Sequence, residues 1–257
     1  MENLVIGYSL SILVGISLGL LGGGGSILTV PILIYVLKID PKLAIALSLA
    51  VVGFSGLFGI VGHLKKGNVL FKVSLVFGTF AMVGTVIGTK LAPFVSSRVQ
   101  LLLFAGLMLA ASVLMIKKPR YSSEEKTSSS EFNFCPKNIT LLTMQAIVVG
   151  VLTGVVGVGG GFMIVPALVL LTKIPMKKAV GSSLVIIVAN SISGFISYQS
   201  TMTIPWEFLC KFTGFSILGI LIGTTISSKV PQEKLKNGFG YFLILMSLFV
   251  FSKNITS

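Results

Sequence analysis

Two clusters of glycine in apolar sequence are the residues best suited to bind a small anion. Clustered glycines disfavour a helix by roughly 1 kcal/mol each. Without side chains, they also let an anion approach backbone N–H groups closely, most favourably near the start of a helix. This chemistry predicts an oxyanion site. Its backbone members are Gly22, Gly23, Gly24 and Gly25, followed by Ser26, and then Gly157, Gly159, Gly160 and Gly161.

Few polar side chains interrupt the apolar spans, so each of them is a candidate ligand. Ser48 and Ser183 occupy matching places in two copies of one pattern, and Asn190 lies seven residues after Ser183 on the same helical face. For each serine two interpretations stay open: the hydroxyl lines a binding site, or it bonds to its own helix backbone. Asn190 is the stronger candidate, because an amide is harder to satisfy within its own helix.

The other reactive residue types indicate neither an enzyme nor a metal centre. All acidic residues fall in or beside predicted loops, and no carboxylate pair, histidine cluster or Ser–His pair occurs at matching depth. His63 ends a span and is interpreted as a solvated loop histidine, and Lys90 as a lysine that reaches toward the headgroups. Cys135 and Cys210 lack zinc-site or disulfide-framework spacing. We expect no catalytic residues, cofactor or metal.

A long apolar segment surrounds each glycine cluster. The first, Leu4 to Leu37, would make about 51 Å of helix at 1.5 Å per residue, against a hydrocarbon core of about 30 Å. The glycines mark the break, and Pro31 and Pro166 beyond them either weaken the next helix or mark its early turns. Freed backbone groups persist in a membrane only beside protein or a water-filled cavity. Two breaks therefore predict a central cavity.

The two halves of the chain repeat one pattern, since Pro31 and Pro166 lie 135 residues apart and other pairs keep that offset. A polar, Ser-rich linker, residues 117–139, separates a first repeat, 1–116, from a second, 140–257. The outer glycines are interpreted as helix-packing positions, namely Gly15, Gly19, Gly84, Gly88, Gly219 and Gly223. The matching pairs include Gly15 with Gly150, Gly19 with Gly154, Lys42 with Lys177, Ser48 with Ser183, and Gly84 with Gly219.

Composition indicates a membrane protein. Of the 257 residues, 54% are hydrophobic and 11% charged, and the mean hydropathy is +1.01, which is too apolar for a soluble surface. The net charge of +13 lies between the apolar spans and forms no basic helix or patch. We therefore expect a lipid bilayer and no nucleic acid as partner.

The charges also bear on topology. If each broken segment counts as one crossing, the 20 Lys and Arg divide equally between the two sides; if it counts as two, they divide fourteen to six. The positive-inside rule prefers the second count, with linker 117–139 cytoplasmic and both termini outside. We expect an all-α polytopic protein of the cell (inner) membrane. It would contain two inverted repeats, each of about four full transmembrane helices plus a Gly/Pro-broken or re-entrant segment.

The phrases Gly15-ISL-Gly19-LL-GGGG-SILTV-Pro31 and Gly150-VLT-Gly154-VV-Gly157-V-GGG-FMIV-Pro166 resemble the signature of the sulfite exporter TauE/SafE family of membrane transporters. The resemblance covers nearly the whole chain. It implies transport of sulfur oxyanions or organosulfonates such as sulfite or sulfoacetate. Some related thiosulfate carriers use cysteines in the transport path, and the places of Cys135 and Cys210 do not match that chemistry.

These observations predict a secondary transporter that moves a small anion by alternating access around a midplane site. Both glycine breaks would form the site, with Ser48, Ser183 and Asn190 as side-chain donors. A passive anion channel and a carrier of another small organic anion are the alternatives, because the same donors serve all three. The expected partners are the anion, the bilayer and, where transport is coupled, H⁺ or Na⁺.

Overall fold

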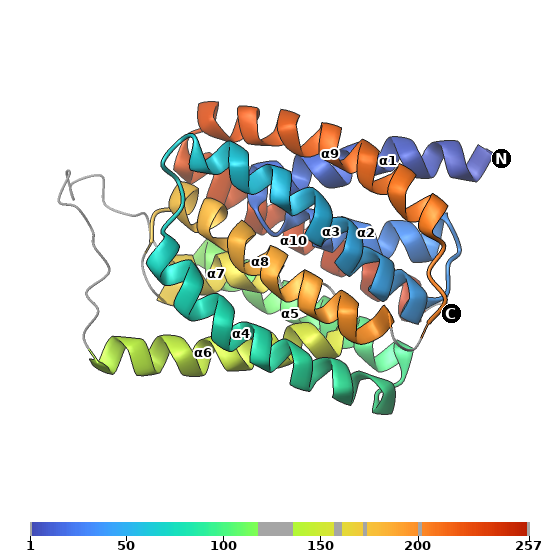
Figure 1. Cartoon of the computed structure of the whole chain (residues 1–257), viewed down its shortest axis with the longest axis horizontal. Helices are drawn as coiled ribbons and strands as arrows, with labels where there is room; N and C mark the ends of the chain where they lie inside the picture. The colour runs from blue at the N-terminus through green and yellow to red at the C-terminus, as the bar shows by residue number, and fades with distance from the viewer. Residues whose placement is uncertain (1, 118–135, 157–160, 172–173, 200–201, 256–257) are drawn as a thin grey trace.

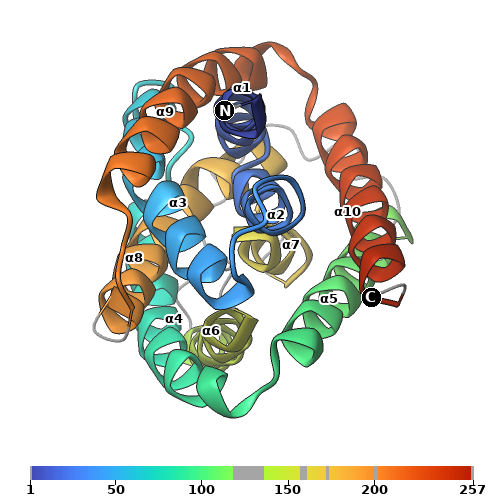
Figure 2. The ribbon, with the colours of Figure 1, turned by 90° about the vertical axis from the view of Figure 1, so that its right-hand side faces the viewer.

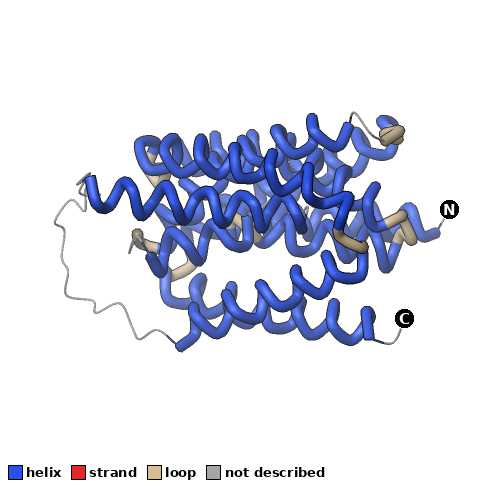
Figure 3. The backbone as a smooth tube through the Cα atoms, turned by 90° about the horizontal axis from the view of Figure 1, so that it is seen from below, coloured by secondary structure: helices blue, strands red, loops and turns tan. Residues whose placement is uncertain are grey.

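The computed structural model is a bundle of helices that run side by side along one axis (Figure 1). It describes residues 2–117, 136–156, 161–171, 174–199 and 202–255, and this part of the chain contains no strand (Figure 3). The helices are α1 (Glu2–Leu21), α2 (Gly24–Pro31), the π-helix η1 (Ile32–Val36), α3 (Pro41–Leu64), α4 (Phe71–Leu91), the 3₁₀-helix η2 (Ala92–Phe94), α5 (Ser97–Lys117), α6 (Pro136–Val156), α7 (Gly161–Leu171), α8 (Met176–Gln199), α9 (Trp206–Lys229) and α10 (Gln232–Ile255).

The first long apolar segment folds into a re-entrant hairpin. Chain reversal occurs at Gly22, whose φ of +73° lies in the left-handed region that glycine adopts without strain. The return arm, α2 with η1, is about 20 Å long at 1.5 Å per residue, shorter than the roughly 30 Å hydrocarbon core. A side chain at Gly7 would meet Leu37, so the arm ends beside the first turns of α1.

The two prolines lie inside the helices α2 and α7, which follow the glycine clusters. Pro31 is the last residue of α2, and the chain stays helical beyond it as a π-helix. Pro166 lies within α7, which continues to Leu171. The first break is therefore made by glycine. Pro31 donates no hydrogen bond to the preceding turn, and a π-helix follows it directly.

In the first half, three crossings follow the hairpin, made by α3, α4 with η2, and α5. Among the described residues, six helices are long and apolar enough to span a membrane, namely α3, α4 with η2, α5, α8, α9 and α10. Both chain termini lie at one end of the bundle (Figure 1). We call this the termini end, which also holds residues 38–40, 92–96 and 202–205. The linker end holds residues 65–70, 174–175 and 230–231.

The helices of the two halves follow the same offset and pack in matching pairs. Helices α3 and α8 begin and end 135 residues apart. Helix α1 packs on α9 as α6 packs on α4, and α3 packs on α9 as α8 packs on α4. The helices α3 and α8 also pack on each other, as do α5 and α10. The first helix of each half therefore lies against the other half.

Close backbone contacts hold the pairs α1–α9 and α4–α6 together. A Cβ atom at Gly15 would overlap the Ser216 carbonyl, and one at Gly88 would overlap the Val151 carbonyl. Small residues allow such approaches between membrane helices. The prediction that the outer glycines are packing positions is confirmed.

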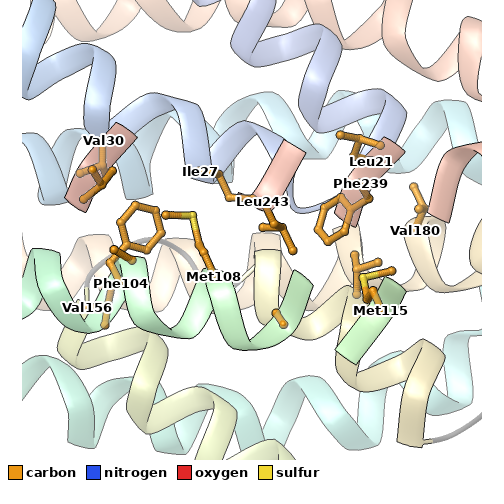
Figure 4. Close-up of a cluster of buried hydrophobic side chains, with 14 of the residues drawn as sticks. Leu21, Ile27, Val30, Phe104, Met108, Met115, Val156, Val180, Phe239 and Leu243 are labelled. Carbon is orange, nitrogen blue, oxygen red and sulfur yellow. The ribbon is translucent and has the colours of Figure 1, made fainter. Parts of the chain in front are cut away.

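The returning helices α2 and α7 lie inside a ring of longer helices when the bundle is viewed along its axis (Figure 2). Apolar side chains from the first hairpin pack there against α5 and α10 (Figure 4). The members of this cluster include Leu21, Ile27, Val30, Phe104, Met108, Phe239 and Leu243.

The outer surface is apolar as well. Leu75, Leu218 and Leu245 are 72%, 55% and 60% exposed, as expected for side chains that face lipid tails. With six helices of spanning length, the prediction of an all-α polytopic membrane protein is confirmed.

Candidate functional site

The turn between α1 and α2 contacts the second half near the start of α8. A Cβ atom at Gly22 would lie 2.7 Å from Ser183 Oγ and 3.1 Å from the Val180 carbonyl oxygen. The φ of +73° at Gly22 also disfavours a side chain. Glycine is thus required on two grounds, and the structure brings Gly22 and Ser183 together, as the predicted site demands.

The start of α2 offers hydrogen-bond donors beside an unpaired hydroxyl. Gly23 precedes the helix without a side-chain cap, and the first N–H groups of a helix have no intrahelical acceptor. The buried Ser17 hydroxyl has no partner in the described part of the chain. A Cβ atom at Gly24 would lie 2.6 Å from that hydroxyl oxygen. Because the N-terminal end of a helix carries partial positive charge, this arrangement suits a small anion.

The serines Ser48 and Ser183 bond to their own helices. Ser48 Oγ donates to the Ile45 carbonyl at 2.8 Å, and Ser183 Oγ donates to the Val180 carbonyl at 2.8 Å. A hydroxyl whose hydrogen is already donated presents lone pairs and not a donor. In this conformation neither serine is an anion donor.

The two serines also lie far apart along the bundle. The part of α3 at the depth of Ser183 is Gly59, because a Cβ atom there would lie 3.3 Å from Leu184, the residue after Ser183. Ser48 and Gly59 are about 16 Å apart along α3 at 1.5 Å per residue. The structure therefore does not bring Ser48 and Ser183 into one site.

Asn190 lies near the middle of α8 and is fully buried. Neither its amide nitrogen nor its amide oxygen has a hydrogen-bond partner in the described part of the chain, and the same holds for the hydroxyl of Ser191. This is where α3 and α8 cross, because Gly53 faces Ser191 and Gly56 faces Val188. Unpaired buried amides are costly, so Asn190 marks a polar position at mid-depth that a ligand or water would stabilise.

A cavity of about 580 Å³ lies at the termini end between the two halves. It is open to the outside, since Lys42, Lys90 and Pro93 at its rim are exposed. Both halves contribute to its wall. The lining residues are Lys42, Ile45, Thr89, Lys90, Ala92, Pro93 and Gln100 from the first half, and Ser197, Tyr198 and Met202 from the second.

The electrostatics of the cavity favour an anion. Its lining holds Lys42 and Lys90 but no acidic side chain. Neither ammonium group forms a hydrogen bond or ion pair with any residue that the structure describes. A partly enclosed space lined by one sign of charge concentrates ions of the opposite sign. The volume falls within the range of small-molecule sites.

Gln100 connects this cavity to the end of α6. It is 2% exposed, and its Nε2 donates to the Ala92 carbonyl at 3.1 Å and to the Val155 carbonyl at 3.0 Å. Val155 is among the last carbonyls of α6, which lack intrahelical donors. The cavity wall is thereby tied to the point where the second apolar segment leaves its first helix.

The interpretation of His63 as a solvated histidine is wrong. Its side chain is 1% exposed, and Nε2 lies 3.1 Å from the Gly19 carbonyl oxygen. Helix α3 continues to Leu64, and the loop that follows it packs on α8, since a Cβ at Gly181 would overlap the Asn68 carbonyl. The His63 ring itself lies against α1, where Nε2 contacts the Gly19 carbonyl.

Several cavity residues escape sequence reasoning because they lie at span ends. The position of Lys90 predicts a headgroup contact, and no sequence pattern distinguishes Gln100 or Tyr198. Lys42 carries a usable signal, because it matches Lys177 at the repeat offset.

Part of the predicted site cannot be placed. Gly157, Gly159 and Gly160 lie outside the described residues, and Gly161 begins α7. Ser26 lies within α2, but its side chain is not described. No group of three or more metal-ligating side chains occurs in the described part of the chain.

Spanning helices, an apolar outer surface and a cationic cavity between two halves define a polytopic membrane transporter. Comparison with known proteins specifies the family. The chain belongs to the sulfite exporter TauE/SafE family, whose pattern matches residues 8–250.

Curated relatives cover nearly the whole chain. A probable membrane transporter protein of Xylella fastidiosa is 30% identical over 252 residues, 97% of this chain and 95% of the relative. The probable membrane transporter protein YdhB of Bacillus subtilis is 27% identical, covering 88% of this chain and 91% of its own. A probable membrane transporter protein of Methanocaldococcus jannaschii is 28% identical over 94% of both chains. No solved structure matches the chain.

Proposed function

We propose that this protein is a secondary transporter that carries small anions by alternating access between its two halves, without converting them chemically. The observation that carries the proposal is the cavity at the termini end. Residues of both halves line it, and Lys42 and Lys90 give it positive charge with no acidic side chain among the lining residues. A site shared by two packed halves is the arrangement in which their relative motion exposes a ligand to each side in turn.

Burial at mid-depth favours a carrier over a channel. A channel requires a continuous wet path, whereas Asn190 and Ser191 are fully enclosed. No wet path therefore passes these two residues in this conformation. The unpaired polar groups of Asn190, Ser191 and Ser17 are the next donors and acceptors that a ligand would reach once the halves move.

The hairpin supports the inverted arrangement. Because the first hairpin returns to its starting end and three crossings follow, the second half begins at the opposite end and runs upside down. Fourteen Lys and Arg belong to segments at the linker side of this topology. By the positive-inside rule, we place the linker 117–139 in the cytoplasm and both termini outside the cell (inner) membrane.

The proposed substrates are sulfur oxyanions and organosulfonates, of the sulfite and sulfoacetate type. The family description, sulfite exporter, supports the sulfur oxyanion, and the cavity supports an organic part. About 580 Å³ exceeds what an inorganic oxyanion fills, and Ile45, Ala92 and Met202 provide apolar wall beside the two lysines. The sulfonate group would lie toward the ammonium groups and the carbon chain toward the apolar wall.

Flux into proteoliposomes tests the proposal. Purified protein is offered sulfite, sulfoacetate, an alkanesulfonate and the matching carboxylates, with and without imposed H⁺ or Na⁺ gradients. We expect saturable uptake and counterflow of at least one sulfur anion. Gradient dependence would identify the coupling ion. Absence of uptake and binding across the whole panel would reject the substrate class, and large non-saturating currents would reject the carrier in favour of a channel.

A further inference from the structure

Residues lining the cavity at the termini end have counterparts 135 positions away at the linker end. A comparison of the two sets shows which end of the bundle is open. The informative pairs are Lys42 with Lys177, Thr89 with Thr224, Pro93 with Ser228, and Ser197 with Gly62.

At the linker end these counterparts touch one another. Lys177 Nζ donates to the Ser228 carbonyl at 3.0 Å, and a Cβ at Gly62 would lie 3.1 Å from Thr224 Oγ1. At the termini end the same four positions line a cavity of about 580 Å³. The structure is thus open at the termini end and closed at the linker end.

Additional hydrogen bonds join the loop after α3 and the first turn of α4 to the second half. The Leu70 N–H donates to Ser182 Oγ at 2.9 Å, and Ser74 Oγ donates to the Ser182 carbonyl at 3.1 Å. Lys66 Nζ donates to the Thr224 carbonyl. We call Lys66, Leu70, Ser74 and Ser182 the linker-end latch.

The termini end lacks the groups to form the same bonds. The counterparts of the latch are Thr201 for Lys66, Pro205 for Leu70, Leu209 for Ser74 and Leu47 for Ser182. Proline has no N–H, leucine has no hydroxyl, and threonine has no ammonium group. If the halves exchanged conformations, closing the termini end would recover neither bond to Ser182 and would replace the ammonium donor by a shorter hydroxyl.

From this asymmetry we propose that the linker-end latch biases the transporter toward the conformation that is open at the termini end. The inference rests on the proposed alternating-access function. The two halves share a fold, so the two end-closed states would be closely matched in free energy without the latch. A latch bond that forms in only one of the two states shifts the ratio of their populations about fivefold. Loss of the latch therefore raises the fraction of molecules open at the linker end.

Cysteine accessibility tests this proposal. In a background with Cys135→Ser and Cys210→Ser, Thr89→Cys reports on the termini end and Thr224→Cys reports on the linker end. A water-soluble maleimide labels the protein in detergent, where both ends are wet. We expect the Thr89 reporter to react at least about tenfold faster, which is the ratio for a state populated to about 90%. Equal rates would overturn the assignment of the open end.

Two variants then remove latch bonds. Ser182→Ala removes the hydroxyl that accepts from Leu70, and Lys66→Ala removes the ammonium group on Thr224. Each is expected to speed labelling at Thr224 about three- to fivefold and to slow labelling at Thr89 by up to about a third. Ser112→Ala is the matched control, since that buried hydroxyl bonds only within its own helix, to Leu109.

Unchanged labelling at both reporters in both variants, with retained elution as a single folded species, would overturn the latch. Because labelling needs no substrate, this test is independent of the transport assay. Shifted labelling without flux of any tested anion would keep the latch and reject the substrate class. Flux with unshifted labelling would reject the latch and keep the transporter.

Discussion

The side-chain nitrogen of Gln100 lies 3.0 Å from the carbonyl oxygen of Val155, so the corner between α4 and α5 is tied to the last turn of α6. Gln100→Leu leaves the carbonyls of Val155 and Ala92 without this donor. We expect a loss of about 1–3 kcal/mol in the free energy of unfolding. A lower midpoint of thermal unfolding in detergent is the measurement, and an unchanged midpoint would show that water replaces the amide without cost.

The two cavity lysines should set the affinity for anions. Lys42→Gln and Lys90→Gln each remove one positive charge from the cavity, and we expect KM for the transported anion to rise about fivefold or more, with a weaker dependence on salt. The control is Lys211→Gln. That lysine is exposed and already paired with Glu207 at 2.6 Å, so its loss should leave KM unchanged. Equal effects at all three positions would indicate a general surface-charge effect.

Gly22→Ala should destabilise the protein by about 1–3 kcal/mol. The positive φ is strained for alanine, and the new methyl group would crowd Ser183 Oγ at 2.7 Å. Gly106→Ala is the matched control, because its Cβ would meet nothing within 4 Å and alanine favours a helix. Thermal unfolding of the two variants should shift in opposite directions; a shift of the same sign would remove the special role of Gly22.

Asn190→Leu should separate stability from transport. The substitution removes two unpaired polar atoms from a fully buried position, and we expect the free energy of unfolding to rise by about 1 kcal/mol or more. Transport should fall at least tenfold if the amide contacts the anion during passage. Retained transport in a stabilised variant would assign Asn190 no part in the path.

Local sequence was sufficient to predict where the first segment breaks. Four consecutive glycines disfavour a helix, and the reversal falls at Gly22, although α2 already begins at Gly24. The role of the serines could not be predicted in the same way. Ser48 and Ser183 match at the repeat offset, but only the backbone determines that each hydroxyl donates to its own helix.

The cavity was beyond prediction for a different reason. Lys42, Lys90 and Gln100 lie at the ends of spans, where a polar residue facing headgroups and one facing a cavity have the same sequence signature. His63 shows the converse error, since it is buried and its Nε2 lies beside the Gly19 carbonyl of α1. Such assignments depend on contacts between residues well separated in the sequence, 44 positions for His63 with Gly19 and 55 for Gln100 with Val155.

The contact between α1 and α9 has a consequence for how the protein is made. Gly15 and Gly19 of α1 require the backbone of α9, which is synthesised about 200 residues later, or roughly 10–40 s at cellular translation rates of 5–20 residues per second. During that interval the first helix of the nascent chain is in the bilayer with its glycine face uncovered. Assembly of the first half must therefore finish after the second half has emerged, and a chain stopped between the halves would present this face to other membrane helices or to quality-control proteases.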